Sequence, residues 1–294
     1  MRRGALFLAA AVLVLLSACT PRTGSSGGVA KAPEGTSLRR IQDRGKLTVG
    51  VKYDVPTFGY LNPRNNQLEG LDIDLAKAIA REVLGSESAV DFKQAVSADR
   101  IPFLTTGQVD LILSTMTANE DRAQQIDFTD AYYVAGQSLL VKKDSTLKGI
   151  NDLAGKTVCS VSGSTSEANI RQKAPQAQVV LFGSYSECLP AIDAGRADAL
   201  STDDSILLGF AYQSPDKYKL VGGQFTIEPY AGGVAKNNPE LLTAIDDAIR
   251  KIKSSGEWKQ IYDKNLTKTT GVAVPKDPPP VAWQDVYKMQ PQAA

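Results

Sequence analysis

The chain of 294 residues holds 3 Cys and no histidine, and this limits the chemistry it can perform. Without histidine, a catalytic base has to be a carboxylate or a lysine, and we find no nucleophile paired with a base, no phosphate loop and no Gly-x-Ser-x-Gly turn. A metal site is not expected, because no C-x-x-C spacing occurs. We therefore expect no catalysis, no metal and no cofactor, and look for residues that bind through charge and hydrogen bonds.

The N-terminus accounts for one cysteine. Arg2 and Arg3 precede an apolar run from Ala5 to Leu16, which has the length of a signal peptide and is too short to span a bilayer. The small residues that follow lead to Cys19 and resemble a lipobox. We predict that residues 1–18 are a lipoprotein signal peptide and that Cys19 is lipidated, which places the protein outside the cytoplasm on a membrane anchor. An ordinary secretory signal with a chance cysteine is the alternative.

Export leaves Cys159 and Cys188 as an even pair in an oxidising compartment. A disulfide between them is the prediction, and two unpaired buried thiols are the alternative. Closing a loop of about 30 residues would stabilise the fold by roughly 3 kcal/mol in the chain-entropy model.

Composition divides the rest of the chain. Residues 19–37 are rich in Gly, Ser, Thr and Pro and predict a flexible tether. Removal of the leader takes away Arg2 and Arg3, so the 33 basic and 32 acidic residues of the full chain become 31 and 32. This near-neutral charge argues against a nucleic-acid partner. About 240 residues remain, more than one core usually holds, and we expect two lobes.

Strand and helix patterns alternate through both halves. A β-rich run at residues 46–52 is followed by apolar residues at helical spacing over 72–84. The order recurs as strand 89–94, helix 98–106 and strand 109–114. A second unit, starting near residue 141, repeats it, with later strands and helices expected at 166–173, 179–182, 186–194, 197–201, 231–235, 240–254 and 257–264. This alternation predicts mostly parallel α/β sheets.

Several collinear segments resemble the polar amino-acid class of bacterial extracellular solute-binding proteins, family 3, from about Leu38 to Leu266. The segments are Gly70-Leu-Asp-Ile-Asp-Leu75, Asp110-Leu-Ile-Leu113, Thr115-Met-Thr117, Arg122, Ile126-Asp-Phe-Thr129, Ala194-Gly-Arg-Ala-Asp-Ala199 and Asp203. Two further segments, Cys159-Ser-Val-Ser-Gly-Ser-Thr165 and Tyr185-Ser-Glu-Cys188, resemble more particularly the glutamate-binding lipoproteins of actinobacterial uptake systems.

The resemblance implies a two-lobed, type II periplasmic-binding-protein-like α/β fold, with two hinge strands and the ligand cleft between the lobes. Hinge strands are expected near 137–142 and 228–232. The expected divisions are lobe 1 at 38–138 and 232–266, lobe 2 at 139–231, and an extended, proline-containing tail at 267–294. It also implies a monomer whose partners are an ABC permease and its ATPase.

Lobe 1 is expected to hold the carboxylate of an α-amino acid. Arg122 is the implied clamp, because a guanidinium can bind a carboxylate through two hydrogen bonds. A surface salt bridge with Glu120 or Asp121 is the alternative. Thr115 and Thr117 are implied ligand contacts, and the alternative for Thr117 is a hydroxyl bonded to backbone.

Lobe 2 is expected to add an anion pocket and a carboxylate. Gly163, Ser164 and Thr165 precede a predicted helix, whose N-terminal N–H groups attract anions. A plain N-cap is the alternative. Asp203 is the implied partner of the ligand ammonium, with the neighbouring Asp204 as the alternative assignment.

Side-chain specificity depends on cations near the cleft. Lys52, at the end of the first strand, and Arg100, at a helix start, are candidates for the γ-carboxylate of glutamate, and Tyr53 is a candidate wall. Solvated surface charges and a packed aromatic are the alternatives. We predict glutamate as the ligand, with glutamine, aspartate and asparagine as alternatives. An amino-acid sensor and an enzyme on the same fold are alternatives of another class.

Overall fold

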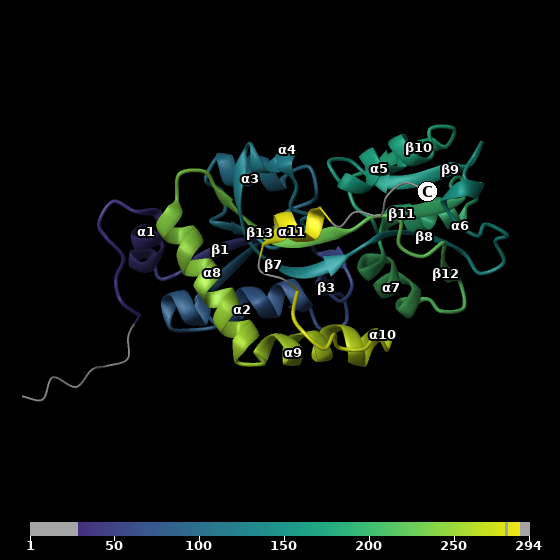
Figure 1. Cartoon of the computed structure of the whole chain (residues 1–294). Helices are drawn as coiled ribbons and strands as arrows, with labels where there is room; N and C mark the ends of the chain where they lie inside the picture. Colours follow the sequence, from purple (N-terminus) through teal and green to yellow (C-terminus); the bar gives the residue numbers. More distant parts are fainter. Residues whose placement is uncertain (1–28, 280–281, 289–294) are drawn as a thin grey trace, which may run out of the picture.

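The protein is described by a computed structural model that covers residues 29–279 and 282–288. The predicted signal peptide, Cys19 and the first part of the predicted tether lie outside the described residues. Figure 1 shows two lobes side by side, each built on a sheet with helices on its faces. Among the described residues, no helix combines the length and the apolar character needed to cross a membrane.

Lobe 1 contains a five-stranded sheet in the order β5-β1-β6-β13-β7. Strand β1 runs parallel to β5 and β6, and β13 runs antiparallel to β6 and β7. The strands are β1 (Leu47–Val51), β5 (Val90–Gln94), β6 (Leu111–Ile112), β7 (Ile126–Ala135) and β13 (Glu228–Ala235). A small antiparallel sheet beside it consists of β2 (Asp54–Val55), β3 (Gly59–Asn62) and β4 (Gln67–Glu69).

Successive side chains of a strand point to opposite faces of the sheet, and both faces of this sheet carry apolar residues. In β6, Leu111 packs with the residues around helices α2 and α8, whereas Ile112 packs with those around α3. Figure 1 shows α2 and α9 on one side of the sheet and α3 and α4 on the other. The helices of this lobe are α1 (Ser37–Arg44), α2 (Leu71–Leu84), α3 (Arg100–Thr105), α4 (Glu120–Ala123), α8 (Pro239–Ser254), α9 (Glu257–Tyr262), α10 (Lys268–Thr270) and α11 (Trp283–Tyr287), with a π-helical turn at Asp263–Thr267.

Lobe 2 contains a second five-stranded sheet in the order β10-β9-β11-β8-β12. Its central strand β11 is parallel to β9 and antiparallel to β8. Its strands are β8 (Gln137–Lys142), β9 (Thr157–Val161), β10 (Gln178–Phe182), β11 (Ala199–Asp203) and β12 (Tyr218–Val221). Its helices are α5 (Thr165–Lys173), α6 (Cys188–Asp193) and α7 (Asp204–Gln213), with a 3-10 turn at Ile150–Asp152.

The chain crosses between the lobes twice. It leaves lobe 1 at Gly136, between β7 and β8, and returns at Glu228, the first residue of β13. A side chain at Gly136 would meet Thr226 O at 2.6 Å, so the two crossings pack against each other. The predicted two-lobed α/β fold with two connecting strands is confirmed.

Two expected boundaries and the expected conformation of the tail need correction. The predicted tether, 19–37, ends too late, because Ala32 is buried and Thr36 caps α1, which begins at Ser37. The predicted lobe 2, 139–231, overlaps β13, whose Glu228 already pairs with Ala135 in the sheet of lobe 1.

The predicted extended tail, 267–294, instead contains α10 and α11. Trp283 explains the second helix, because its side chain, only 7% exposed, packs edge-on against Phe128 at a centroid distance of 5.7 Å. Burial of a large aromatic ring against lobe 1 outweighs the proline-rich local preference.

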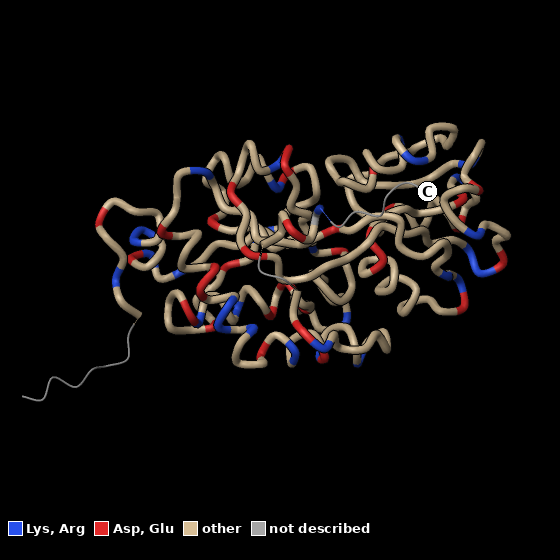
Figure 2. The backbone as a smooth tube through the Cα atoms, viewed as in Figure 1, with Lys and Arg blue, Asp and Glu red and all other residues tan. Residues whose placement is uncertain are grey.

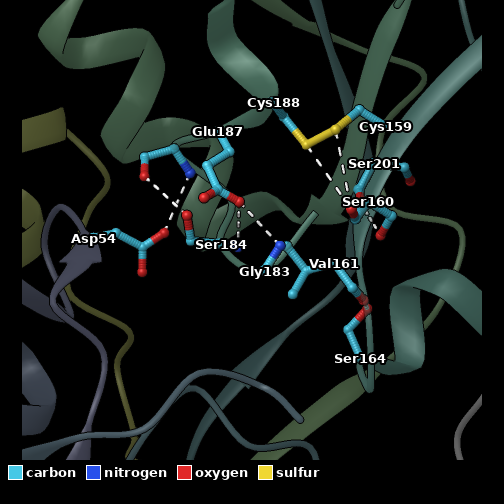
Figure 3. The surroundings of a disulfide bond; sticks show 11 residues. Asp54, Cys159, Ser160, Val161, Ser164, Gly183, Ser184, Glu187, Cys188 and Ser201 are labelled. Atoms are coloured by element: carbon cyan, nitrogen blue, oxygen red, sulfur yellow. Dashed lines mark hydrogen bonds between the residues drawn. A yellow bond between two sulfur atoms is a disulfide. The ribbon is translucent and has the colours of Figure 1, made fainter. Parts of the chain in front are cut away.

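The predicted disulfide is present between Cys159 in β9 and Cys188 at the start of α6, with a Cα–Cα distance of 5.8 Å. Figure 3 shows Ser184 and Glu187, of the loop at residues 183–187, between the disulfide and Asp54 of lobe 1. A disulfide restricts the unfolded chain, and a sequence separation of 29 corresponds to a stabilisation of about 3 to 4 kcal/mol.

Removing this disulfide is therefore expected to lower the melting temperature by roughly 10 °C. Thermal unfolding followed by circular dichroism, with and without a thiol reductant, measures the change. A Cys159→Ser/Cys188→Ser double variant is the control, since it should have the lower melting temperature both with and without the reductant. Equal melting temperatures for the oxidised protein and this variant would contradict the prediction.

Candidate ligand-binding cleft

Three buried cations from lobe 1 face lobe 2. Lys52 follows β1 and is 1% exposed, while Arg100 begins α3 and Arg122 lies in α4. Within the described part of the chain, none of the three takes part in an ion pair. The surface salt bridges that sequence allowed for Arg122 are therefore not formed. Buried charges without an opposite charge nearby are costly, so these cations are available to pair with an anion.

Backbone carbonyl groups orient both arginines. Arg100 Nη1 donates to Thr115 O at 3.2 Å, and Arg122 Nη1 donates to Thr117 O at 2.6 Å. The Nη2 groups of both reach across to Gly163 O of lobe 2, at 3.3 and 3.1 Å. The lobes are thus closed on each other, and two guanidinium groups sit at the seam.

Desolvation disfavours the charged forms of Lys52 and Arg122 as long as no opposite charge lies beside them. Burial, reinforced by the Arg100 guanidinium, lowers the pKa of the Lys52 ammonium to about 7. Asp54 and Asp99 oppose this shift, and Arg122 adds to it. Burial, then Arg100, lowers the pKa of Arg122 to about 9, so this guanidinium stays charged at neutral pH. An anion in the cleft would relieve both costs.

The loop before α5 supplies polar groups from lobe 2. Ser164 is the N-cap of this helix, and its Oγ accepts a hydrogen bond from Glu167 N at 3.2 Å. Thr165 Oγ1 lies 3.5 Å from Thr117 Oγ1 of lobe 1. Gly163 has a positive φ of 77°, and a Cβ there would meet Ala98 Cα at 2.9 Å. Glycine at this position therefore lets the loop approach lobe 1 closely.

One carboxylate of lobe 2 has an unused oxygen. Asp203 ends β11 and is 4% exposed; its Oδ2 accepts a hydrogen bond from the Tyr230 hydroxyl at 2.6 Å, while its Oδ1 has no partner among the described residues. Burial, then the Glu228 carboxylate, raises the pKa of Asp203 well above its usual value. The alternative, Asp204, instead accepts from Gly136 N at 3.2 Å and so holds the crossing between the lobes.

The structure does not bring every predicted residue into the cleft by its side chain. The Tyr53 hydroxyl donates to Phe92 O at 3.4 Å, within lobe 1, so Tyr53 packs on its own lobe. Thr115 contributes its backbone: the N–H donates to Asp72 Oδ2 at 3.0 Å, and the carbonyl accepts from Arg100. Its positive φ of 43° marks a strained turn that the surrounding contacts hold.

Three functional candidates were missed. Glu228 is buried and accepts hydrogen bonds from Thr165 Oγ1 at 2.9 Å and Asn169 Nδ2 at 3.0 Å. Asp72 is buried beneath Thr115, and burial raises its pKa to about 6. Tyr185 covers Lys52 from lobe 2. Glu228 had a signal, since it is a carboxylate within an otherwise apolar segment. Asp72 and Tyr185 lie in segments that carried the family resemblance, but neither residue was singled out.

Two lobes that enclose buried, unpaired charges of both signs define a binding protein for a small polar solute. The chain belongs to the bacterial extracellular solute-binding proteins, family 3, whose sequence model matches residues 47–268. The match spans both lobes and both crossings between them.

Relatives of known name span nearly the whole chain. The "ABC transporter glutamine-binding protein GlnH" of Bacillus subtilis is 44% identical over 253 residues, which cover 86% of this chain and 92% of that protein. The "Glutamate-binding protein GluB" of Corynebacterium glutamicum is 30% identical, with 97% of each covered. A solved "ancestral arginine-binding protein bound to arginine" is 39% identical with a TM-score of 0.71, covering 76% of this chain and 99% of that one.

Proposed function

We propose that the protein is the extracytoplasmic binding protein of an ABC amino-acid importer and that it captures L-glutamate. The observation that carries this proposal is the charge pattern of the cleft. Lys52, Arg100 and Arg122 face the carboxylates of Asp203 and Glu228, all buried and none in an ion pair within the described residues. Glutamate carries two carboxylates and one ammonium, which complements this set.

Each charged group of glutamate has a proposed partner. Arg122 and the loop at Gly163 to Thr165 bind the α-carboxylate, with Thr117 as a further donor, and the free Oδ1 of Asp203 accepts from the ammonium. The γ-carboxylate then lies toward Lys52 and Arg100. These roles rest on the geometry of closed lobes, where the groups of both lobes meet.

Closure couples capture to delivery. Ligand contacts from both lobes exist together only when the lobes meet, so a ligand that uses them shifts the population toward the closed form. The importer's permease would recognise that form and pass the amino acid on, driven by its ATPase. An alternative is a sensor, in which the closed form signals to a membrane partner.

Glutamine is the second candidate ligand, and the relative GlnH of Bacillus subtilis favours it by its name and its 44% identity. GluB of Corynebacterium glutamicum, at 30% identity, favours glutamate. Aspartate and asparagine carry the same α-groups on a shorter side chain. Excess positive charge at the side-chain end of the cleft decides our preference for glutamate, since a neutral amide would leave the Lys52 charge uncompensated.

The ligand panel tests the proposal directly. We expect calorimetry on the mature protein, produced without its lipid, to give the tightest binding for L-glutamate. The panel includes L-glutamine, L-aspartate, L-asparagine and L-arginine. Tightest binding of glutamine would replace glutamate by glutamine, and no binding of any amino acid would refute the function.

Glutamate affinity is expected to fall as the pH rises above about 7. The pKa of Lys52 is about 7 when the lobes are closed without a ligand, and a bound γ-carboxylate would raise it because an opposite charge favours the ammonium. Binding then takes up a proton above this pH. Affinity is full at lower pH and decreases by up to about tenfold per pH unit as the free lysine loses its proton. Calorimetry between about pH 6 and pH 9 measures this.

Glutamine is the control for this pH dependence, because its neutral side chain gains nothing from the charge on Lys52. A Lys52→Gln variant should bind glutamate weakly with a flat profile over the same range. Parallel pH profiles for glutamate and glutamine in the unmodified protein would contradict the prediction.

The location and form of the protein complete the proposal. We propose a lipid anchor on Cys19 after removal of residues 1–18, a monomeric state, and a binding role without catalysis. Acidic and basic residues are interspersed along the described backbone of both lobes (Figure 2), as suits a protein that has no polyanionic partner. Mass spectrometry of the N-terminal peptide from the native host tests the anchor.

A further inference from the structure

Tyr185 reaches the cleft from lobe 2. It lies in the loop between β10 and α6, is 3% exposed, and its ring centroid is 5.6 Å from Lys52 Nζ. The cation belongs to lobe 1 and the ring to lobe 2, so this contact forms only when the lobes are closed. Besides this ring, Lys52 Nζ has a hydrogen bond to Ser97 Oγ at 2.8 Å.

The loop that carries Tyr185 is held at both ends. Gly183 N and Ser184 N donate to Glu187 Oε2 at 3.0 and 3.1 Å, which tightens the turn (Figure 3). Cys188, which follows directly, is tied to β9 by the disulfide, and its N–H donates to Tyr185 O at 3.1 Å. These contacts give the ring a defined position rather than that of a free loop side chain.

The same loop touches lobe 1 at a second point. Ser186 N donates to Asp54 Oδ2 at 3.2 Å, and Figure 3 shows Asp54 approaching the loop from the opposite lobe. Asp54 lies two residues after Lys52, so the loop closes over the end of β1 at which the γ-carboxylate is proposed to bind.

We infer that Tyr185 is a specificity-determining residue, which covers the side-chain end of the cleft, keeps water from the Lys52 ammonium and so favours a ligand with a second carboxylate. This inference rests on the proposed glutamate site. The face of an aromatic ring attracts a cation, and a ring that excludes water also lowers the local dielectric. A charged γ-carboxylate then gains more from Lys52, and a neutral amide leaves the buried charge unpaired.

The test compares glutamate and glutamine affinities for variants of one residue. Tyr185→Leu removes the ring and keeps an apolar side chain. It is expected to weaken glutamate by roughly 3- to 30-fold, the range from an exposed to a desolvated cation–π contact, with a much smaller loss for glutamine. Tyr185→Phe keeps the ring and should retain most of the preference. Tyr212→Leu is the matched control, because Tyr212 lies in the same lobe and is 54% exposed.

A double-mutant cycle separates this role from support of the fold. If Tyr185 acts through Lys52, then Tyr185→Leu should cost little further glutamate affinity in a Lys52→Met background. Equal losses in both backgrounds, or an unchanged ratio of glutamate to glutamine affinity in Tyr185→Leu, would overturn the inference. Should Tyr185→Leu not fold, Tyr185→Trp retains an aromatic face, and loss of the glutamate preference in that variant would overturn it equally.

Failure of the inference differs from failure of the proposed function. If the unmodified protein does not bind glutamate, the glutamate site itself is refuted, and the role of Tyr185 with it. If the unmodified protein prefers glutamate and Tyr185→Leu keeps that preference in full, only the role of Tyr185 is refuted.

Discussion

Arg122→Ala and Asp203→Ala are each expected to cause a large loss of amino-acid affinity. Arg122 is the proposed clamp for the α-carboxylate, and Asp203 offers the free Oδ1 to the ammonium. Removing one partner of a buried, hydrogen-bonded charge pair costs about 2 to 5 kcal/mol, so affinity falls by roughly 30- to 5000-fold. Calorimetry with the preferred amino acid measures the loss.

The free protein should unfold at nearly the same temperature in both variants, because each substitution removes a desolvated charge along with its hydrogen bonds. Arg171→Ala is the matched control for the arginine, since that side chain is exposed on α5 and should leave affinity unchanged. Wild-type affinity in Arg122→Ala or Asp203→Ala would show that the substituted residue does not hold the ligand and that other side chains do.

Lys52→Gln should weaken glutamate far more than glutamine. The substitution removes the buried ammonium proposed to pair with the γ-carboxylate, and loss of such a pair costs about 2 to 5 kcal/mol. An amide ligand loses at most a hydrogen bond, about 0.5 to 1.5 kcal/mol. Arg100→Gln should show the same direction, and calorimetry with both ligands gives the ratio.

Arg100 also holds more of the lobe 1 backbone than Arg122 does. Its guanidinium donates to the carbonyls of Ser97, Ser114 and Thr115, whereas within lobe 1 that of Arg122 donates to Thr117 O alone. Arg100→Gln is therefore expected to lower the melting temperature as well, whereas Lys52→Gln should raise it or leave it unchanged. Lys46→Gln is the matched control for the lysine, because Lys46 is a partly exposed residue at the opposite end of β1. Equal losses of affinity for glutamate and glutamine in Lys52→Gln would show that Lys52 does not discriminate between the two ligand side chains.

Local patterns were reliable wherever the evidence for an element lay within a few residues. The β-rich run at 46–52 became β1, and the apolar spacing over 72–84 became α2, which ends at Gly85 with a left-handed φ of 84°. Boundaries were less accurate in short elements: the strand expected at 109–114 is β6, Leu111–Ile112. There the pairing partners, not the strand's own residues, decide its length.

The same distinction holds for the candidate site: local segments point to some of its residues, and long-range contacts decide the others. Arg122 and Asp203 were predicted because each follows a recognisable segment, and both lie where the lobes meet. For Tyr53 the structure favours the alternative, a packed aromatic, and nothing local tells whether an aromatic after a strand faces a cleft or packs on its own lobe. Glu228 and Tyr185 were missed because they reach the site only through contacts between distant parts of the chain.

By itself, the sequence determined the α/β class, the pairing of Cys159 with Cys188, and the charged residues available for an amino-acid ligand. Those depend on composition, on the even number of cysteines left after export and on the spacing of apolar residues, all of which can be read from the sequence alone. Only the tertiary structure decided which charges lack partners, that Asp204 holds the hinge while Asp203 faces the cleft, and that the tail folds back through Trp283. These outcomes arise when closure buries one set of side chains against another, and such desolvation is a property of the assembled lobes.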